Sequence, residues 1–257
     1  MRKEKKSPNG MTFLEHLDEL RKRLFYTFLV VIVAVIPAWF FSKSLYRIIA
    51  HPVTQFLPEG KKLAFTSLTA PFMLYIKVSF LAAILATIPF IFFQLWMFIA
   101  PGLYQREKKH VIPFVFFTSF FFMAGAVFAY FVVFPFACNF FLGLGADFDP
   151  VITVDQYFSL ALRVILGIAL VFELPTLAFF LARIGLITAR MMIKYFKYAV
   201  LVIFIIAAII TPTPDMVTQS IIAVPMMALY GLSILITLMV GKSREKEKKK
   251  ADEDLAG

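Results

Sequence analysis

The sequence contains few of the residues from which most catalytic and metal sites are built. Its 257 residues include one cysteine and three histidines. The single Cys138 excludes an internal disulfide and gives no indication of a metal cluster. His16, His51 and His110 all lie outside the long apolar runs, and no Walker-type glycine loop is present. An intramembrane protease would therefore lack a histidine base, and we expect a protein that is not an enzyme and uses no metal or cofactor.

Charged residues are also scarce, since they make up 16% of the chain against 61% hydrophobic residues. A soluble domain of this size could not cover so much apolar surface, so the composition predicts a membrane protein surrounded by lipid. The net charge of +10 does not indicate a nucleic-acid partner, because the cations lie between apolar runs and at both ends. The basic, polar start and the lack of a small-residue cleavage site after the first run predict no cleavable signal peptide.

Six continuous apolar runs predict an all-α polytopic fold, because lipid tolerates only helices or closed barrels and these runs do not alternate. The expected transmembrane helices are residues 24–41, 73–99, 112–135, 157–182, 197–211 and 219–240. They divide the chain into an N-terminal amphipathic segment (1–23), a transmembrane domain (24–241) and a charged tail (242–257), which we expect to be disordered and solvated. The fifth run is short, so it is either a re-entrant segment or a short span that thins the bilayer.

The distribution of lysine and arginine predicts the orientation. Twenty of the 26 lie in the N-terminal segment, in the connections 99–111 and 182–197 and in the tail, whereas the opposite connections hold four. Both termini are therefore predicted in the cytoplasm, and the even number of crossings favours a short fifth span. Lys77 and Arg163 remain just inside spans near the outer face, where their side chains would reach the interface by snorkelling.

Three polar residues lie in or beside the later spans. Glu173, in "LVFELP", is expected inside the hydrocarbon, either as a neutral carboxyl hydrogen-bonded between helices or as a functional group facing a wet cavity. Asp215 and Gln219, in "TPTPDMVTQ", lie at the outer mouth between the two final spans. Asp215 is either part of a functional site or a turn residue that caps the last helix.

The stretch "TFLEHLDELRKRL" before the first span combines an apolar stripe with charged pairs. The stripe consists of Phe13, Leu17, Leu20 and Leu24. Asp18–Lys22 and Glu19–Arg23 have the favourable acid-first i,i+4 spacing, which is typical of an interfacial helix with internal ion pairs. Glu107 is likewise embedded among cations in the next cytoplasmic connection. The two carboxylates Glu19 and Glu107 alternatively form a socket for an arginine of a partner, because a guanidinium binds carboxylates bidentately.

Several motifs occur in order over residues 12–241: "HLDELRKRL", "FQLWMFIAPGLYQRE", "FAYFVVFPFA", "FELP" and "TPTPD" followed by "TQ". In this combination the chain resembles the TatC family, the receptor subunit of the twin-arginine protein translocase. The resemblance implies six helices in a curved, glove-like bundle in the cytoplasmic (inner) membrane, with both termini cytoplasmic. It also implies self-association in a complex with the single-span subunits TatA and TatB. That complex would bind twin-arginine signal peptides and export folded proteins, driven by the proton-motive force.

The resemblance also implies roles for particular residues. Signal-peptide binding falls to Glu19 and Glu107, with a surrounding recognition surface of Arg21, Phe98, Pro101 and Leu103. Pro52 matches a proline of the first outer loop. Glu173 matches the polar residue of the concave face, and Asp215 and Gln219 match an outer-edge pair, although "TPTPD" has one threonine more than the shorter "TPPD" form.

Two other classes of function are compatible with the residues. A proton-coupled secondary transporter would use Glu173 as its ion site and should show inverted repeats, of which the sequence gives no convincing sign. A structural scaffold for other membrane subunits would need the helices but not the cytoplasmic carboxylates.

Overall fold

The structure, a computed structural model, describes residues 13–57, 62–99, 111–145, 147–148, 151–211 and 215–256. Within these residues the regular structure is helical, apart from one isolated β-bridge between Ala64 and Thr153. The elements are α1 (Phe13–Phe40), α2 (Ser42–Thr54), α3 (Ala70–Ile99), α4 (Val111–Phe128), the π-helix η3 (Ala129–Val133), α5 (Phe134–Leu144), α6 (Val154–Val171), α7 (Leu174–Ile184), α8 (Ala189–Lys194), α9 (Phe196–Ile210) and α10 (Met216–Ala256). The predicted all-α fold is confirmed.

Six apolar helical segments correspond to the six predicted runs. Five are long and apolar enough to cross a membrane: Leu14–Phe40, Ala70–Ile99, Ile112–Leu144, Val154–Ile184 and Met216–Gly241. The sixth, α9, has 15 residues. At 1.5 Å per residue it is about 22 Å long, which is shorter than the ~30 Å of a bilayer's hydrocarbon. The polytopic architecture follows directly from the apolar runs.

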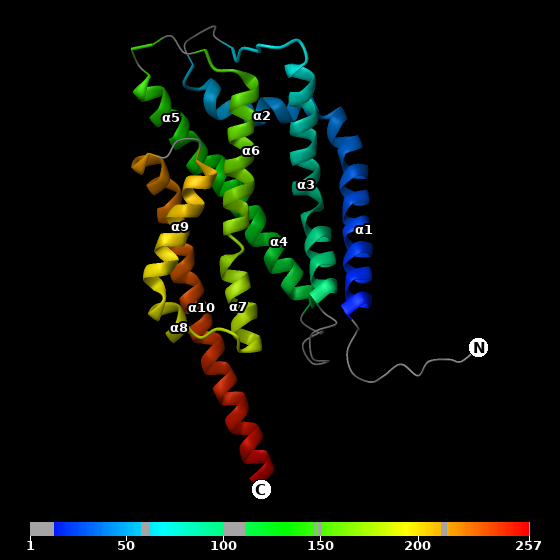
Figure 1. Cartoon of the computed structure of the whole chain (residues 1–257), viewed down its shortest axis with the longest axis vertical. Helices are drawn as coiled ribbons and strands as arrows, with labels where there is room; N and C mark the ends of the chain where they lie inside the picture. The colour runs from blue at the N-terminus through cyan, green and yellow to red at the C-terminus, as the bar shows by residue number, and fades with distance from the viewer. Residues whose placement is uncertain are drawn as a thin grey trace, which may run out of the picture.

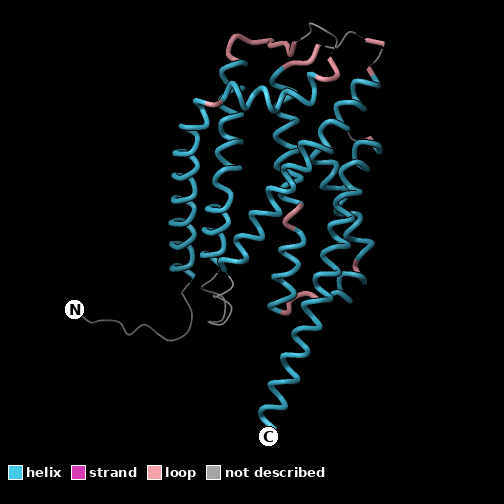
Figure 2. Tube along the Cα trace, turned by 180° about the vertical axis from the view of Figure 1, so that it is seen from behind, coloured by secondary structure: helices cyan, strands magenta, loops and turns pink. Residues whose placement is uncertain are grey.

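The helices stand side by side, and the start of α1 and the end of α10 lie at the same end of the bundle (Figure 1). We call this the lower end, as it is drawn in Figure 1, and the opposite one the upper end. α1 packs against α3, α4 packs against α3 and α6, and α7 packs against α10. The connections that join α2 to α3 and α5 to α6 gather at the upper end (Figure 2). An even number of crossings is consistent with this arrangement.

α2 lies across the upper end, in a stretch that the sequence analysis treated as an outer connection. It is amphipathic, with Ile49 and Val53 buried, and its lysine and arginine interrupt the hydropathy that marks a span. Two tyrosines hold it to the bundle: the hydroxyl of Tyr157 donates to the carbonyl of Ile49 at 2.8 Å, and that of Tyr130 to the carbonyl of Ile48 at 2.7 Å. Pro52 is buried within this helix.

At the upper end, backbone hydrogen bonds join the connection before α3 to the connection before α6. The backbone N–H of Ala64 donates to Ile152 at 2.9 Å, and that of Val154 donates back to Ala64 at 2.8 Å. Close by, the ammonium group of Lys77 lies 3.0 Å from the carboxylate of Asp155. The sequence analysis left Lys77 without a partner, and the structure supplies one in a carboxylate 78 residues further along the chain. We call these contacts the upper rim.

The predicted fourth span, 157–182, is broken into two helices. α6 ends at Val171 and α7 begins at Leu174, with Glu173 at the N-cap position and Pro175 in the first turn. Pro175 has no N–H for the carbonyl of Val171, and its ring would clash with that carbonyl in a continuous helix. The break cannot be recognised from the hydropathy of the run. It places Glu173 at a helix terminus.

The charged tail is not the disordered segment expected from its composition, because α10 continues through it to Ala256. Lysine, glutamate, arginine and alanine all have high helix propensity. The apolar part of α10 also supplies a formed helix, so the tail extends a helix without the cost of nucleating one.

Candidate functional site

At the lower end, Glu19, one of the two carboxylates predicted to bind an arginine, forms an ion pair within α1. The guanidinium of Arg23 approaches one oxygen of Glu19 through Nη2 at 2.6 Å and Nε at 2.7 Å. The two side chains are 23% and 20% exposed, so water screens the pair only in part. This pair was predicted from the i,i+4 spacing, whereas Asp18 and Lys22, with the same spacing, form no ion pair in the structure.

The same arginine also joins α1 to α3. Nη1 of Arg23 donates to the side-chain oxygen of Gln94 at 2.9 Å, and Gln94 is buried. One turn further along α3, the ring of Phe98 stacks on His16 of α1 with centroids 4.3 Å apart. Glu19 therefore lies on a helix face held by two contacts with α3, and its carboxylate is positioned rather than free to rotate.

Sequence reasoning missed Gln94 and His16. Gln94 was detectable as a lone amide in the long apolar run 73–99, one turn before Phe98 and so on the same helix face. Its partner could not be identified from the sequence, because Arg23 lies 71 residues away.

The other residues predicted for this surface are placed as follows. Arg21 is exposed on α1, two residues from both Glu19 and Arg23 and hence on a different face. Glu107, Pro101 and Leu103 lie outside the described residues. The structure thus brings Glu19 and Phe98 to the same helix pair and leaves Pro52 at the upper end, away from both.

Glu173 lies inside the bundle, at the break between α6 and α7, and is 4% exposed. Its carboxyl group lies near the backbone of Phe122 on α4, and its Oε1 has no hydrogen-bond partner among the described residues. Two other buried polar atoms in the described part of the chain also lack partners, Thr176 Oγ1 and Trp96 Nε1. Thr176 is one turn from Glu173, and the ring of Trp96 packs on Phe180 of α7 with centroids 4.5 Å apart. Burying polar atoms costs free energy unless they are hydrogen-bonded. The bundle around α7 would therefore be stabilised by a group that forms hydrogen bonds with these atoms.

Asp215 acts as the N-cap of α10. Its Oδ1 accepts the backbone N–H of Thr218 at 2.8 Å, and its Oδ2 accepts the hydroxyl of the same residue. Gln219 follows in the first turns and is half-buried, with its own N–H bonded to the carbonyl of Asp215 at 3.2 Å. Of the two interpretations of Asp215, helix capping is the one that this geometry supports.

These features define a class: multi-pass membrane proteins with an arginine-binding carboxylate at the lower end of the bundle and a buried carboxyl inside it. Residues 15–225 match the family model described as Sec-independent protein translocase protein (TatC). Relatives with that description include one from Koribacter versatilis, 40% identical over 251 residues, covering 96% of this chain and 93% of the relative. Another, from Helicobacter pylori, is 45% identical over 226 residues and covers 88% of this chain and 87% of the relative.

A solved structure described as the twin arginine translocase receptor TatC superposes with a TM-score of 0.78 at 36% identity, covering 88% of this chain and 99% of the other. The chain belongs to the TatC family. It is therefore a membrane-spanning receptor component of a protein translocase, and the resemblance noted from the sequence motifs is confirmed.

Proposed function

We propose that this chain binds twin-arginine signal peptides and that Glu19 and Glu107 receive the paired arginines at the cytoplasmic face of the membrane. The observation that carries the proposal is the contact between Glu19 and Arg23, in which two N–H groups of a guanidinium approach one carboxylate oxygen. Glu19 thus already binds the chemical group that a twin-arginine signal presents. A carboxylate held in this way has lost most of the rotational freedom that binding would otherwise cost.

Binding is an exchange of one guanidinium for another. An arginine of the signal peptide displaces Arg23 from Glu19, and Gln94 retains the displaced guanidinium through its 2.9 Å hydrogen bond. Arg23 loses its carboxylate in the exchange, but it keeps this hydrogen bond and its side chain is 23% exposed, so water solvates the charge and limits the cost. Glu107 takes the second arginine, and Phe98 contributes the apolar part of the surface.

The orientation that this proposal requires places the lower end in the cytoplasm, in the cytoplasmic (inner) membrane of the cell. The excess of lysine and arginine in the connections of that end supports it. In a Cys138→Ala background, Asp147→Cys should react with an impermeant maleimide added outside the cell. Arg190→Cys and Lys250→Cys should not react. Labelling of Lys250→Cys from outside would mean that the short helix α9 does not cross the membrane.

The binding partners in transport are TatA-type and TatB-type single-span subunits, and the complex exports folded proteins with the proton-motive force. Glu173 supports this assignment, because its Oε1 and the nearby Thr176 Oγ1 are buried without a hydrogen-bond partner in the described residues, and a partner helix that entered the bundle here would supply one. Glu173→Ala should reduce crosslinking to the single-span subunits and leave signal-peptide binding intact. Equal loss of peptide binding in Glu173→Ala and Glu107→Ala would contradict this division of roles.

The direct test of the receptor function is the affinity of the purified protein for a twin-arginine peptide. A charge-assisted hydrogen bond contributes about 1.5–3 kcal/mol, so losing one carboxylate weakens binding roughly 10- to 150-fold. Partial exposure of Glu19 puts its effect near the low end. Asp18→Ala is the matched control. Asp18 lies on the same helix, and its carboxylate forms no ion pair with the described residues. A folded Glu19→Ala, Glu107→Ala double variant that binds the peptide like the parent would refute the proposal.

A further inference from the structure

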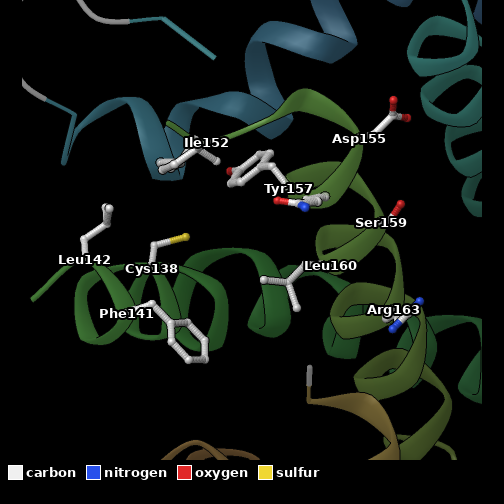
Figure 3. A pocket seen from close by; sticks show the side chains of 11 residues that line it. Cys138, Phe141, Leu142, Ile152, Asp155, Tyr157, Ser159, Leu160 and Arg163 are labelled. Carbon is white, nitrogen blue, oxygen red and sulfur yellow. The ribbon is translucent and has the colours of Figure 1, made fainter. Parts of the chain in front are cut away.

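A pocket of about 700 Å³ opens between α5 and α6 next to the upper rim, and Asp155 and Ile152 of the rim are among its lining residues. Its two walls differ in chemistry (Figure 3). The α5 wall is apolar and presents Cys138, Phe141 and Leu142, while the α6 wall carries Ser159 and Arg163. An amphipathic pocket of this kind suits a ligand with an apolar part and a polar part.

Arg163 is the cation of this pocket. Asp155, Ser159 and Arg163 are spaced by four residues and form one stripe along α6, with Asp155 uppermost and Arg163 deepest (Figure 3). Asp155 is already paired with Lys77 of α3 at 3.0 Å. Arg163 is exposed and forms no ion pair or hydrogen bond with the described part of the chain. The pocket therefore has one positive charge that is not compensated within the described residues.

The short helix α9 fixes the level of Arg163 in the membrane. Gly167, one turn below Arg163, packs against Ile210 at the upper end of α9, where an added Cβ would lie 2.9 Å from the Ile210 side chain. Lipid around a short helix adjusts so that its headgroups follow the end of that helix. A headgroup region that follows the end of α9 would lie beside Gly167, one helical turn from Arg163, and so within reach of its guanidinium.

We propose that this pocket binds an anionic phospholipid of the outer leaflet, with its phosphate on Arg163 and an acyl chain along the α5 wall. A guanidinium matches the geometry of a phosphate and forms two parallel hydrogen bonds with it. Ser159 and Gln156 line the same pocket and supply donors for the glycerol and headgroup oxygens. An apolar protein helix in this place would leave the arginine without a counter-charge. The assignment to the outer leaflet rests on the proposed orientation of the bundle, but not on signal-peptide binding, which we place at the other end.

Native mass spectrometry of the purified full-length protein with added phosphatidylglycerol or phosphatidylcholine tests the proposal. The parent should retain one phosphatidylglycerol in preference to phosphatidylcholine. Arg163→Gln should weaken that binding about tenfold. Arg47→Gln should not change it, because Arg47 is an exposed cation on α2 outside the pocket. Leu142→Trp keeps the charge but fills the apolar wall, and it should also displace the lipid.

Three results would overturn the proposal. The first is unchanged phosphatidylglycerol binding in Arg163→Gln protein whose melting temperature matches the parent. The second is displacement of the lipid by inorganic phosphate at millimolar concentration, which would assign the site to a soluble anion. The third is loss of a dimer peak in Arg163→Gln with lipid binding unchanged, which would assign the pocket to a second copy of the chain.

Discussion

Replacing Arg23 by glutamine should make the protein bind twin-arginine signal peptides more tightly. The proposed mechanism requires the incoming arginine to displace Arg23 from Glu19, so removing Arg23 removes that step. Glutamine has a similar length and keeps a hydrogen-bonding group opposite Gln94. The change therefore tests the competition while disturbing the α1–α3 contact as little as possible.

The size of the effect follows from the exposure of the pair. Fully exposed ion pairs contribute about 0.2–1 kcal/mol, and charge-assisted hydrogen bonds in protected sites contribute about 1.5–3 kcal/mol. Glu19 and Arg23 are 20% and 23% exposed and share two short contacts, so a contribution of about 1 kcal/mol is reasonable. Since 1.4 kcal/mol is a factor of ten, Arg23→Gln should lower the Kd for the peptide about fivefold.

The assay is titration of a fluorescent twin-arginine peptide into purified protein at two salt concentrations. Lys22→Gln is the matched control, because it removes the same charge from the neighbouring position but breaks no ion pair. It corrects for the general attraction that a less basic surface exerts on a cationic peptide. If Arg23→Gln and Lys22→Gln tighten binding equally, or if neither does, Arg23 does not compete for Glu19.

Three further changes test the packing and the polar groups of the bundle. Glu173→Gln should change the free energy of unfolding by no more than about 0.5 kcal/mol, since the amide keeps a hydrogen bond, whereas Glu173→Ala should cost roughly 1–2 kcal/mol in chemical unfolding. Lys77→Gln should destabilise by about 0.5–1 kcal/mol, and a double-mutant cycle with Asp155→Asn should recover that coupling. Gly125→Ala should cost about 1–3 kcal/mol, because the new Cβ would lie 2.7–2.8 Å from side-chain and backbone atoms of the facing helix turn. Gly143→Ala, with nothing within 4 Å, should leave the melting temperature unchanged or higher.

The sequence predicted the features of the fold that depend on composition. Long apolar runs identified the six helical segments, since lipid leaves the backbone few other structures. Features that depend on single residues inside a run do not follow from composition. Pro175 interrupts the fourth predicted span, and hydropathy averaged along the run does not detect the lost N–H. α2 was missed for the opposite reason, because its charged face lowers the hydropathy of a stretch that is helical all the same.

In the candidate site, too, a contact between residues close in sequence was predictable, whereas contacts between residues far apart in sequence were not. The pair of Glu19 with Arg23 was predictable, because residues four apart on a helix are neighbours. Gln94 as the second partner of Arg23, and Asp155 as the partner of Lys77, join segments more than 70 residues apart, and no periodicity within a single run contains that information. The capping role of Asp215 was one of two predictions, and its 2.8 Å hydrogen bond from the N–H of Thr218 confirms that capping occurs.

The upper rim has a mechanical consequence for the opposite end of the molecule. Two backbone hydrogen bonds and an ion pair tie the outer connections to each other there. Helix α3 runs 30 residues away from this tie, about 45 Å at 1.5 Å per residue. A rotation of about 5° around the rim would therefore move the far end of such a helix by about 4 Å, more than the length of a hydrogen bond. A peptide that bound at Glu19 as proposed would therefore act at the end of the helices that is far from these contacts, where a small rotation gives the largest displacement.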